Sequence, residues 1–263
     1  MRGKGMQMNL VDRYIEELEK QLNMIRTSQK DSIQKAADRI ADSIAKGGIL
    51  HVFGSGHSHM IAEDVFHRAG GLICVNAMLE ESLMEINVGR TTQLERLNGY
   101  ASILLNGYDL KAGEVIIIVS NSGMNAVPIE MAIECKARGL YIIVLTNMDH
   151  TSTADSRHES GKKLYELADL VLDNCGVYGD AVLSYDQSGK KVGPTSTIGG
   201  LIIIQTLMIA IVEELIKRNA SPPVLVSANT EGGDKHNKQL IARYYDRIKY
   251  LAKPNQNSNE SET

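Results

Sequence analysis

The N-terminal part of the chain carries apolar side chains at helical spacing. Apolar residues recur every three or four positions over 11–25 and again over 33–44, with charged residues on the opposite faces. The polar residues Thr27 and Asp31 stand between the two stripes and are typical of helix caps and turns. The pattern predicts an N-terminal helical hairpin over residues 1–46 that packs on the main domain.

Short apolar runs alternate with helical patterns over residues 47–252. Runs of β-branched and apolar residues predict strands at 49–53, 72–75, 115–119, 141–145 and 170–172. The run at 115–119 is apolar at every position, as expected for a parallel strand that helices cover on both faces. About five strands that alternate with helices predict an open parallel α/β sheet, because a closed barrel needs eight.

A long apolar helix is expected at 195–219, followed by an irregular polar stretch and a final helix at about 237–251. A helix that is apolar nearly all round is buried on several sides, and a second subunit is the simplest cover. We therefore expect a homodimer. Residues 253–263 have the polar composition of a disordered tail, so the main domain is expected to end at residue 252.

The composition is that of a soluble globular protein. Hydrophobic residues make up 43% of the chain and charged residues 23%, which argues against the disordered, collagenous and membrane classes. The longest apolar block, at 198–212, is shorter than the roughly 18 residues that span a bilayer. No apolar signal core stands near the N-terminus, and three widely spaced cysteines without a CxxC motif are typical of reduced cytosolic thiols. We expect a cytoplasmic protein with no membrane contact.

Nucleic acid is not an expected partner. The net charge of −4 gives no basic field that would attract a polyanion. The chain has no Trp and only 2 Phe, so it offers few side chains on which bases could stack.

Two turns rich in glycine and hydroxyl residues follow predicted strands. The first turn consists of Gly54, Ser55, Gly56, His57 and Ser58, and the second consists of Ser120, Asn121, Ser122 and Gly123. Ligands of open α/β sheets bind where strands turn into helices, and the N–H groups of a helix start attract anions. One such turn is as typical of a plain connection as of a site. Two in one sheet predict a site for a small anion, with phosphate as the natural candidate.

Other glycine-rich motifs are absent. A dinucleotide-binding GxGxxG motif that began at Gly54 would need glycine where the chain has His59, and both Gly-Lys pairs lack the hydroxyl residue of a P-loop. No cofactor is therefore expected. His57, His59, Glu63 and His67 are possible metal ligands, and the last three share a helix face. Three ligands on one helix without a second motif make a weak metal site. No metal is expected.

The sequence LKAGEVIIIVSNSG at 110–123, together with the order and spacing of the two turns, resembles the sugar isomerase (SIS) domain family of phosphosugar-binding proteins. The resemblance covers about residues 47–212. It implies a three-layer, flavodoxin-like parallel sheet with a sugar phosphate as its small-molecule ligand. In that family the hydroxyls of the second turn hold the phosphate, which implies a binding role for Ser120, Ser122 and Gly123.

The first turn contributes Ser58, which matches the phosphate-side serine of the family. His57 and Asn125 stand where the family often has a hydroxyl residue, and both side chains can still donate hydrogen bonds. We therefore include them, with the other residues of both turns, among the expected ligand-binding residues.

The chain looks most like an uncharacterised bacterial branch of this family, somewhat like phosphoheptose isomerases and muramic acid phosphate etherases. The resemblance implies an aldose–ketose isomerase that moves a proton through an enediol. An amino-sugar phosphate etherase and a non-catalytic sugar-phosphate sensor remain as alternatives.

The residues that would move the proton follow less directly from the resemblance. The catalytic Glu of the heptose isomerases aligns near Arg68, which cannot accept a proton. Glu80 and Glu81 follow the second predicted strand and Glu63 lies on the first helix of the domain, so these are the candidate bases. A solvated surface carboxylate is the alternative for each. His236 lies in a late loop from which relatives recruit a ring-opening histidine, and imidazole suits acid/base work at neutral pH.

Overall fold

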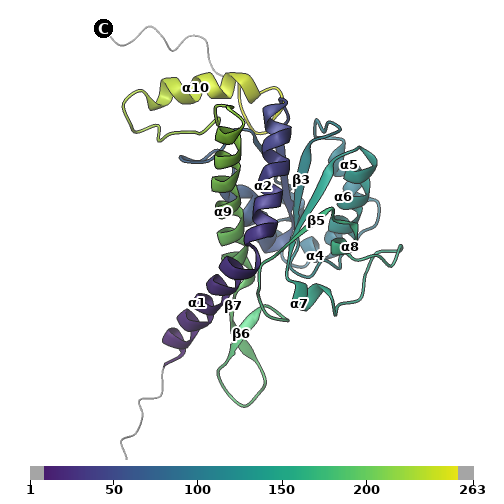
Figure 1. The fold of residues 1–263 in the computed structure, drawn as a ribbon. Helices are drawn as coiled ribbons and strands as arrows, with labels where there is room; N and C mark the ends of the chain where they lie inside the picture. Colours follow the sequence, from purple (N-terminus) through teal and green to yellow (C-terminus); the bar gives the residue numbers. More distant parts are fainter. Residues whose placement is uncertain (1–8, 254–263) are drawn as a thin grey trace, which may run out of the picture.

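The computed structural model describes residues 9–253 and has an α/β fold built on a five-stranded sheet (Figure 1). The strands are β1 (Leu50–Gly54), β2 (Val75–Met78), β3 (Val115–Val119), β4 (Tyr141–Thr146) and β5 (Leu170–Asp173). They are all parallel and follow the order β2-β1-β3-β4-β5. The predicted open, flavodoxin-like parallel sheet is confirmed.

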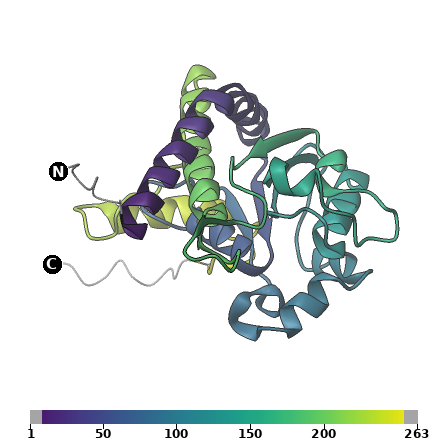
Figure 2. The same cartoon turned by 90° about the horizontal axis from the view of Figure 1, so that it is seen from below.

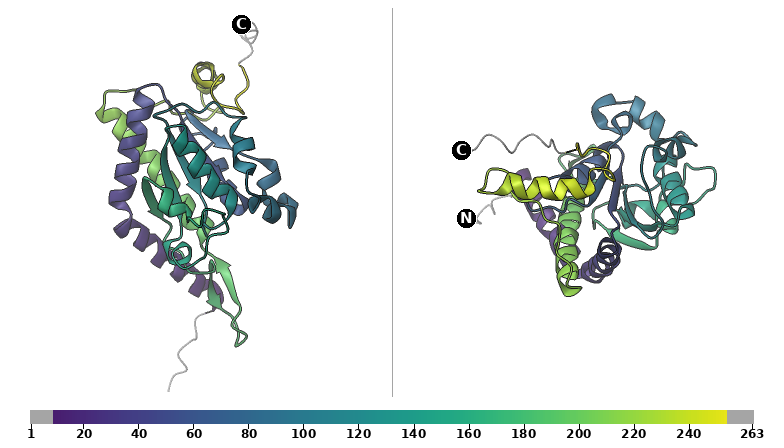
Figure 3. Two further views of the ribbon diagram at one scale, coloured as in Figure 1. Left: turned by 90° about the vertical axis from the view of Figure 1, so that its right-hand side faces the viewer. Right: turned by 90° about the horizontal axis from the view of Figure 1, so that it is seen from above.

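Helices cover both faces of the sheet and complete three layers (Figures 1, 2 and 3). One face carries α2 (Lys30–Ala45), α3 (His59–Asp64) and α9 (Ser196–Lys217), and the other carries α5 (Tyr100–Leu105), α6 (Ala126–Ala137) and α8 (Leu164–Leu167). In β3, Val115 and Ile117 pack in the first core, whereas Ile116 and Ile118 pack in the second. Both faces are buried, which is why this strand is apolar at every position.

The helices α1 (Leu10–Ser28) and α2 do not form the predicted hairpin. Only Gln29 separates them; its N–H donates to the Ile25 carbonyl and its own carbonyl accepts from Ile33, so the helical ladder continues through the junction. Figure 1 shows α1 extending away from the sheet instead of folding back along α2. Thr27, which suggested a turn, donates to the Asn23 carbonyl of its own helix. Both helices exist where predicted, but the hairpin was wrong.

The predicted long apolar helix is α9, which lies beside α2 (Figure 1). Its Gly199 and Gly200 approach neighbours so closely that an added Cβ would collide with Gln21 of α1 and Ile61 of α3. By length and composition α9 could cross a membrane, with a mean hydropathy of 1.9, but 56% of that stretch is buried inside the protein. A buried core helix of a soluble protein has these same properties.

The remaining elements differ most from the prediction. A hairpin of β6 (Ala181–Ser184) and β7 (Lys191–Pro194), which the sequence did not predict, projects beyond the sheet (Figure 3). The last helix, α10 (Gly233–Tyr244), begins and ends earlier than expected. Leu72 does not start β2 but forms a single antiparallel bridge with Val224. Apart from Lys253, the predicted tail at 253–263 lies outside the described residues.

A buried polar network lies at the amino-terminal end of β1. His51 is fully buried, with Nε2 3.0 Å from Glu114 Oε2 and Nδ1 3.1 Å from Asn76 Nδ2 on β2. Arg247 donates to Glu114 Oε1 at 2.8 Å, and the N–H of Ile49 donates to the same oxygen at 3.0 Å. Burial alone would raise the pKa of Glu114, but the hydrogen bonds from His51 and Arg247 outweigh it and lower the pKa to about 2. This carboxylate therefore joins the start of β1 to the segment before β3.

Replacing Glu114 with Gln tests this network. Because the folded pKa lies below an unfolded value of about 4.3, the contribution of the carboxylate is full above that value and is lost as the pH falls toward 2. Removing the buried partner of Arg247 is expected to lower the free energy of unfolding at neutral pH by about 3 kcal/mol, as measured by urea denaturation. Glu114→Gln should then lose less stability than the wild type on acidification. Equal acid sensitivity of the two proteins would contradict the assignment; Glu16→Gln, on an exposed position of α1, is the control.

Candidate functional site

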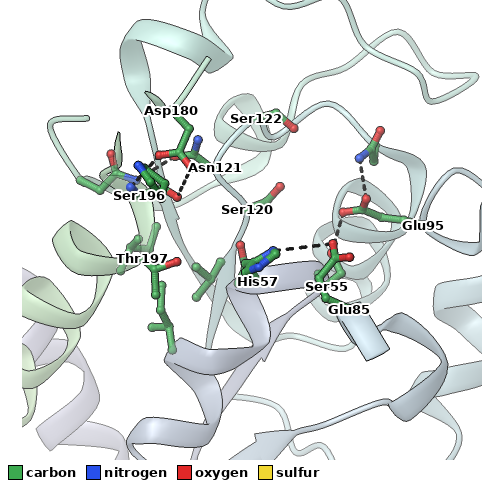
Figure 4. A pocket seen from close by; sticks show the side chains of 18 residues that line it. Ser55, His57, Glu85, Glu95, Ser120, Asn121, Ser122, Asp180, Ser196 and Thr197 are labelled. Atoms are coloured by element: carbon green, nitrogen blue, oxygen red, sulfur yellow. Dashed lines mark hydrogen bonds and ion pairs between the residues drawn. The ribbon is translucent and has the colours of Figure 1, made fainter. Parts of the chain in front are cut away.

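A cavity of about 410 Å³ opens beyond the carboxyl ends of β1 and β3. These strands pair in parallel, with Gly54 opposite Val119, so the turns that follow them leave the same edge of the sheet. From β1 the chain crosses to β2 on one side, and from β3 it crosses to β4 on the other. This reversal of direction is the switch point at which open α/β sheets bind ligands. Figure 4 shows the side chains that line the cavity.

The first turn forms one wall of the cavity. Four of its five predicted residues line it: Ser55, Gly56, His57 and Ser58. Gly56 has φ +56°, a left-handed conformation that favours glycine, and an added Cβ would meet Glu85 Oε1 at 2.9 Å. Gly54 ends β1 without lining the cavity, but a Cβ there would collide with the Ser58 carbonyl.

The second turn faces the first. Its cavity-lining residues are Ser120, Asn121 and Ser122, and Asn125 at the start of α6 joins them. Gly123 does not line the cavity, but its left-handed φ of +60° turns the chain and its N–H donates to Ser120 Oγ at 3.2 Å. Within residues 9–253, the N–H groups of Asn121 and Ser122 make no hydrogen bond. They are therefore available to a bound anion.

One carboxylate joins the two turns. Glu95, the last residue of α4 (Arg90–Glu95), accepts a hydrogen bond from Ser55 Oγ at 2.6 Å and another from Asn125 Nδ2 at 2.8 Å. Arg157 donates to Asn125 Oδ1 at 2.9 Å, which fixes the orientation of that amide. Burial raises the pKa of Glu95, and the two hydrogen bonds oppose that rise without cancelling it. Glu95 thus holds the first turn against the start of α6.

The third wall comes from the end of β7 and the start of α9. Asp180 Oδ1 accepts from the N–H groups of Thr195 at 2.9 Å and Ser196 at 2.7 Å, so it caps α9. Its Oδ2 accepts from Ser196 Oγ at 3.0 Å. Asp180, Ser196 and Thr197 all line the cavity. Each oxygen of Asp180 is therefore already engaged in holding this wall.

Two titratable side chains of the cavity face each other with few other contacts. His57 Nδ1 lies 3.8 Å from Glu85 Oε1, and the two side chains are 67% and 38% exposed. Glu85 belongs to a short 3₁₀ turn, Glu85–Asn87, that follows β2. No Lys or Arg is found among the described residues that line the cavity; its titratable residues are His57, Glu85, Glu95 and Asp180.

The four catalytic candidates from the sequence do not line this cavity. Glu63 pairs with His59 at 3.6 Å and is exposed on α3, and Glu80 accepts from Ser82 at 3.1 Å. Glu81 is exposed. His236 lies on α10, and its Nε2 is 2.9 Å from the Val224 carbonyl. Figure 1 shows α10 at the opposite end of the sheet from α7 (Met148–Thr151), the helix after β4.

The cavity also contains residues that sequence reasoning missed, chiefly Glu85, Glu95 and Asp180. Glu85 lies in the segment after β2 in which an acidic residue was expected, but several positions beyond Glu80. No spacing signal marks any of the three, because Glu85 lies in a short 3₁₀ turn, Glu95 ends a six-residue helix and Asp180 lies in a loop. Among residues 9–253, no group of three or more His, Cys, Asp or Glu side chains is arranged to hold a metal ion.

The sequence is similar to that of known proteins. The SIS domain family matches residues 13–147. A UPF0309 protein of Caldanaerobacter subterraneus subsp. tengcongensis is 43% identical over 247 residues, which cover 92% of this chain and 100% of that protein. A UPF0309 protein of Geobacillus thermodenitrificans is 38% identical over 244 residues, with 92% and 98% covered. The chain therefore belongs to the SIS domain family, among proteins named UPF0309, and the resemblance found in its two turns is confirmed.

Solved structures share the fold. A phosphoheptose isomerase from Francisella tularensis superimposes with a TM-score of 0.52 at 17% identity, covering 78% of this chain and 100% of that one. A phosphoheptose isomerase from Neisseria gonorrhoeae gives a TM-score of 0.52 at 16% identity, covering 77% and 97%. These similarities extend over most of the chain and concern its architecture.

Glu95→Gln tests the bridge between the turns. The Gln amide keeps one acceptor but turns a donor toward either Ser55 or Asn125, and Arg157 prevents the Asn125 amide from flipping to compensate. Hydrogen bonds to a charged group contribute about 1.5–3 kcal/mol, so we expect a loss of that order in the free energy of unfolding. Amide hydrogen exchange should accelerate in the turns at 55–58 and 120–125. Gln93→Ala, at an exposed position of the same helix, is the control, and unchanged exchange in Glu95→Gln would contradict the bridge.

Proposed function

We propose that this protein binds a sugar phosphate in the cavity, with the phosphate held between the two serine-rich turns. The observation that carries the proposal is the convergence of Ser58, Ser120 and Ser122 on one cavity, beside two N–H groups that have no hydrogen-bond partner among residues 9–253. Hydroxyl and amide donors at helix starts bind phosphate without a cationic side chain. A net charge of −4 is therefore no obstacle to binding a small anion.

The rest of the cavity suits the sugar. A volume of about 410 Å³ accommodates one monosaccharide rather than a polymer. The carboxylates of Glu85 and Asp180 and the amide of Asn174 offer acceptors and donors to sugar hydroxyls. Membership of the SIS domain family, and fold neighbours that are named phosphoheptose isomerases, support the same ligand class.

The reaction that we propose is aldose–ketose isomerisation through an enediol. It needs a group that moves a proton between adjacent carbons and an acid/base that opens the sugar ring, and the cavity offers four titratable side chains. An etherase that acts on an amino-sugar phosphate would need a similar base for an α-proton and stays the alternative. A non-catalytic sensor would bind the same ligand without proton transfer.

Thermal shift measurements test the binding proposal. We expect at least one of fructose 6-phosphate, sedoheptulose 7-phosphate and glucosamine 6-phosphate to raise the melting temperature of the wild type. Ser120→Ala and Ser122→Ala each remove a hydroxyl donor to a charged group, so Kd should rise by about tenfold or more. Ser184→Ala, at an exposed position of β6, should bind like the wild type. The proposal fails if no sugar phosphate in the panel stabilises the wild type, or if the Ser120→Ala,Ser122→Ala double variant binds unchanged.

A homodimer in the cytoplasm remains part of the proposal. Apolar side chains stay exposed on neighbouring helices: Val11 (71%) and Ile15 (50%) on α1, and Ile209 (64%) and Ile216 (60%) on α9. We infer that a second subunit covers part of these side chains. Sedimentation velocity should give twice the mass of the chain, and Ile209→Glu should lower it to the monomer value. A wild-type protein that sediments as a monomer would exclude the dimer.

A further inference from the structure

We propose that His57 and Glu85 are the acid/base pair that moves the proton in the isomerisation; the assignment rests on the sugar-phosphate function proposed above. Neither residue was a catalytic candidate from the sequence. Both line the cavity, and Figure 4 shows them side by side with the contact that joins them.

Availability separates this pair from the other titratable groups of the cavity. Both oxygens of Glu95 accept hydrogen bonds, from Ser55 and from Asn125. Both oxygens of Asp180 are engaged by the start of α9. Among the described residues, the side chains of His57 and Glu85 form an ion pair with each other and make no side-chain hydrogen bond, although the Glu85 carboxylate also repels that of Glu95. A group that transfers a proton must be able to approach the substrate. Hydrogen bonds to the protein fix Glu95 and Asp180 in the walls, whereas no described residue fixes His57 or Glu85 in this way.

The position of His57 connects it to the proposed phosphate site. His57 and Ser58 are consecutive residues of the same 3₁₀ turn, Gly56–Ser58. A hydrogen bond from the Ser58 N–H to the Ser55 carbonyl, at 3.0 Å, closes this turn. A phosphate bound at Ser58 would therefore hold the sugar at a fixed distance from the imidazole. Orientation of this kind is a large part of what an enzyme site contributes to rate.

The mutual geometry assigns the roles. Nδ1 of His57 faces the Glu85 carboxylate at 3.8 Å, which leaves Nε2 directed away from the carboxylate and free for the substrate. A neighbouring carboxylate stabilises the imidazolium that forms when Nε2 takes a proton. Glycine at position 56 permits this approach, because a Cβ there would lie 2.9 Å from Glu85 Oε1.

The proton transfer balances without a co-reactant. Nε2 of His57 removes the proton from the carbon next to the sugar carbonyl. The electron pair of that C–H bond forms the C=C bond of the enediol, while the carbonyl π electrons move to oxygen. The imidazolium returns the proton to the former carbonyl carbon, and the hydroxyl proton moves from one oxygen to the other. One carbon is reduced as its neighbour is oxidised, so no cofactor enters.

The test is exchange of carbon-bound hydrogen with solvent, followed by ¹H NMR in D2O. The probes are fructose 6-phosphate, sedoheptulose 7-phosphate and glucosamine 6-phosphate, each incubated with the full chain. We expect the wild type to replace the hydrogen next to the carbonyl of at least one probe with deuterium. His57→Asn should lower that rate by about 100-fold or more, and Glu85→Gln should lower it by a smaller factor, while both variants keep the ligand-induced thermal shift.

The control is His67→Asn. His67 is exposed, lies outside the cavity and has φ +43°, which asparagine tolerates. Exchange at the wild-type rate in this variant shows that loss of a histidine alone has no effect. Urea denaturation of His57→Asn and Glu85→Gln separates a lost proton transfer from a lost fold. His57 is largely exposed and Glu85 is partly exposed without a side-chain hydrogen bond to the described residues, so the free energy of unfolding should stay near that of the wild type.

Each outcome decides the assignment. Slow exchange in His57→Asn with retained thermal shift supports it. Wild-type exchange in His57→Asn overturns it, and so does a wild type that is stabilised by a probe but exchanges no hydrogen; the binding proposal survives both results. If no probe stabilises the wild type, the binding proposal fails and the assignment fails with it. The titratable groups that face His57 across the cavity are Glu85, Glu95 and Asp180, so a pH profile of the rate must be compared between the wild type and Glu85→Gln.

Discussion

The parallel pairing of β1 with β3 at the centre of the sheet determines where everything else in the site can lie. Because Gly54 is level with Val119, two turns that are more than sixty positions apart in the sequence leave the sheet beside each other. The chain then diverges to β2 and β4, which leaves the space between the turns unfilled. The buried Glu114 network fixes the other end of the same two segments. A shift of this register would remove the cavity without changing any residue that lines it.

The carboxylates of the cavity divide into two kinds. Glu95 and Asp180 satisfy hydrogen-bond donors of the protein itself and so maintain the walls. Glu85 has no such task and faces His57. Hydrogen bonds from the protein hold Glu95 and Asp180 in place, whereas no described residue donates a hydrogen bond to the Glu85 carboxylate. Glu95 and Asp180 therefore stabilise the walls of the cavity, and we propose that Glu85 takes part in the proton transfer.

The sheet and the two turns were predictable because their signals are local. An apolar run such as 115–119 is stable only where both of its faces are buried, as in a parallel strand. Glycine and serine directly after such a run are typical of the turn that follows a strand. The errors arose where the outcome depends on distant contacts. The segment around Thr27 is compatible with a turn or a helix, and the path of α1 depends on distant bonds from Tyr14 to the Pro194 carbonyl and from Gln21 to the Asn174 carbonyl. Glu85, Glu95 and Asp180 reach the cavity from a 3₁₀ turn, the end of a short helix and a loop, so no periodicity distinguishes them from the exposed Glu63 or Glu81.

The claim that both turns bind one phosphate is tested most directly by an NMR titration of the ¹⁵N-labelled protein with fructose 6-phosphate. If one phosphate binds between both turns, the amide signals of residues 56–58 and 121–123 shift together on addition of fructose 6-phosphate and give a single Kd. A second cavity, of about 650 Å³, lies at the opposite end of the sheet and contains Arg39, Lys46, Lys111 and Arg247. Shifts confined to the amides around that cavity, or to only one of the two turns, would contradict the account.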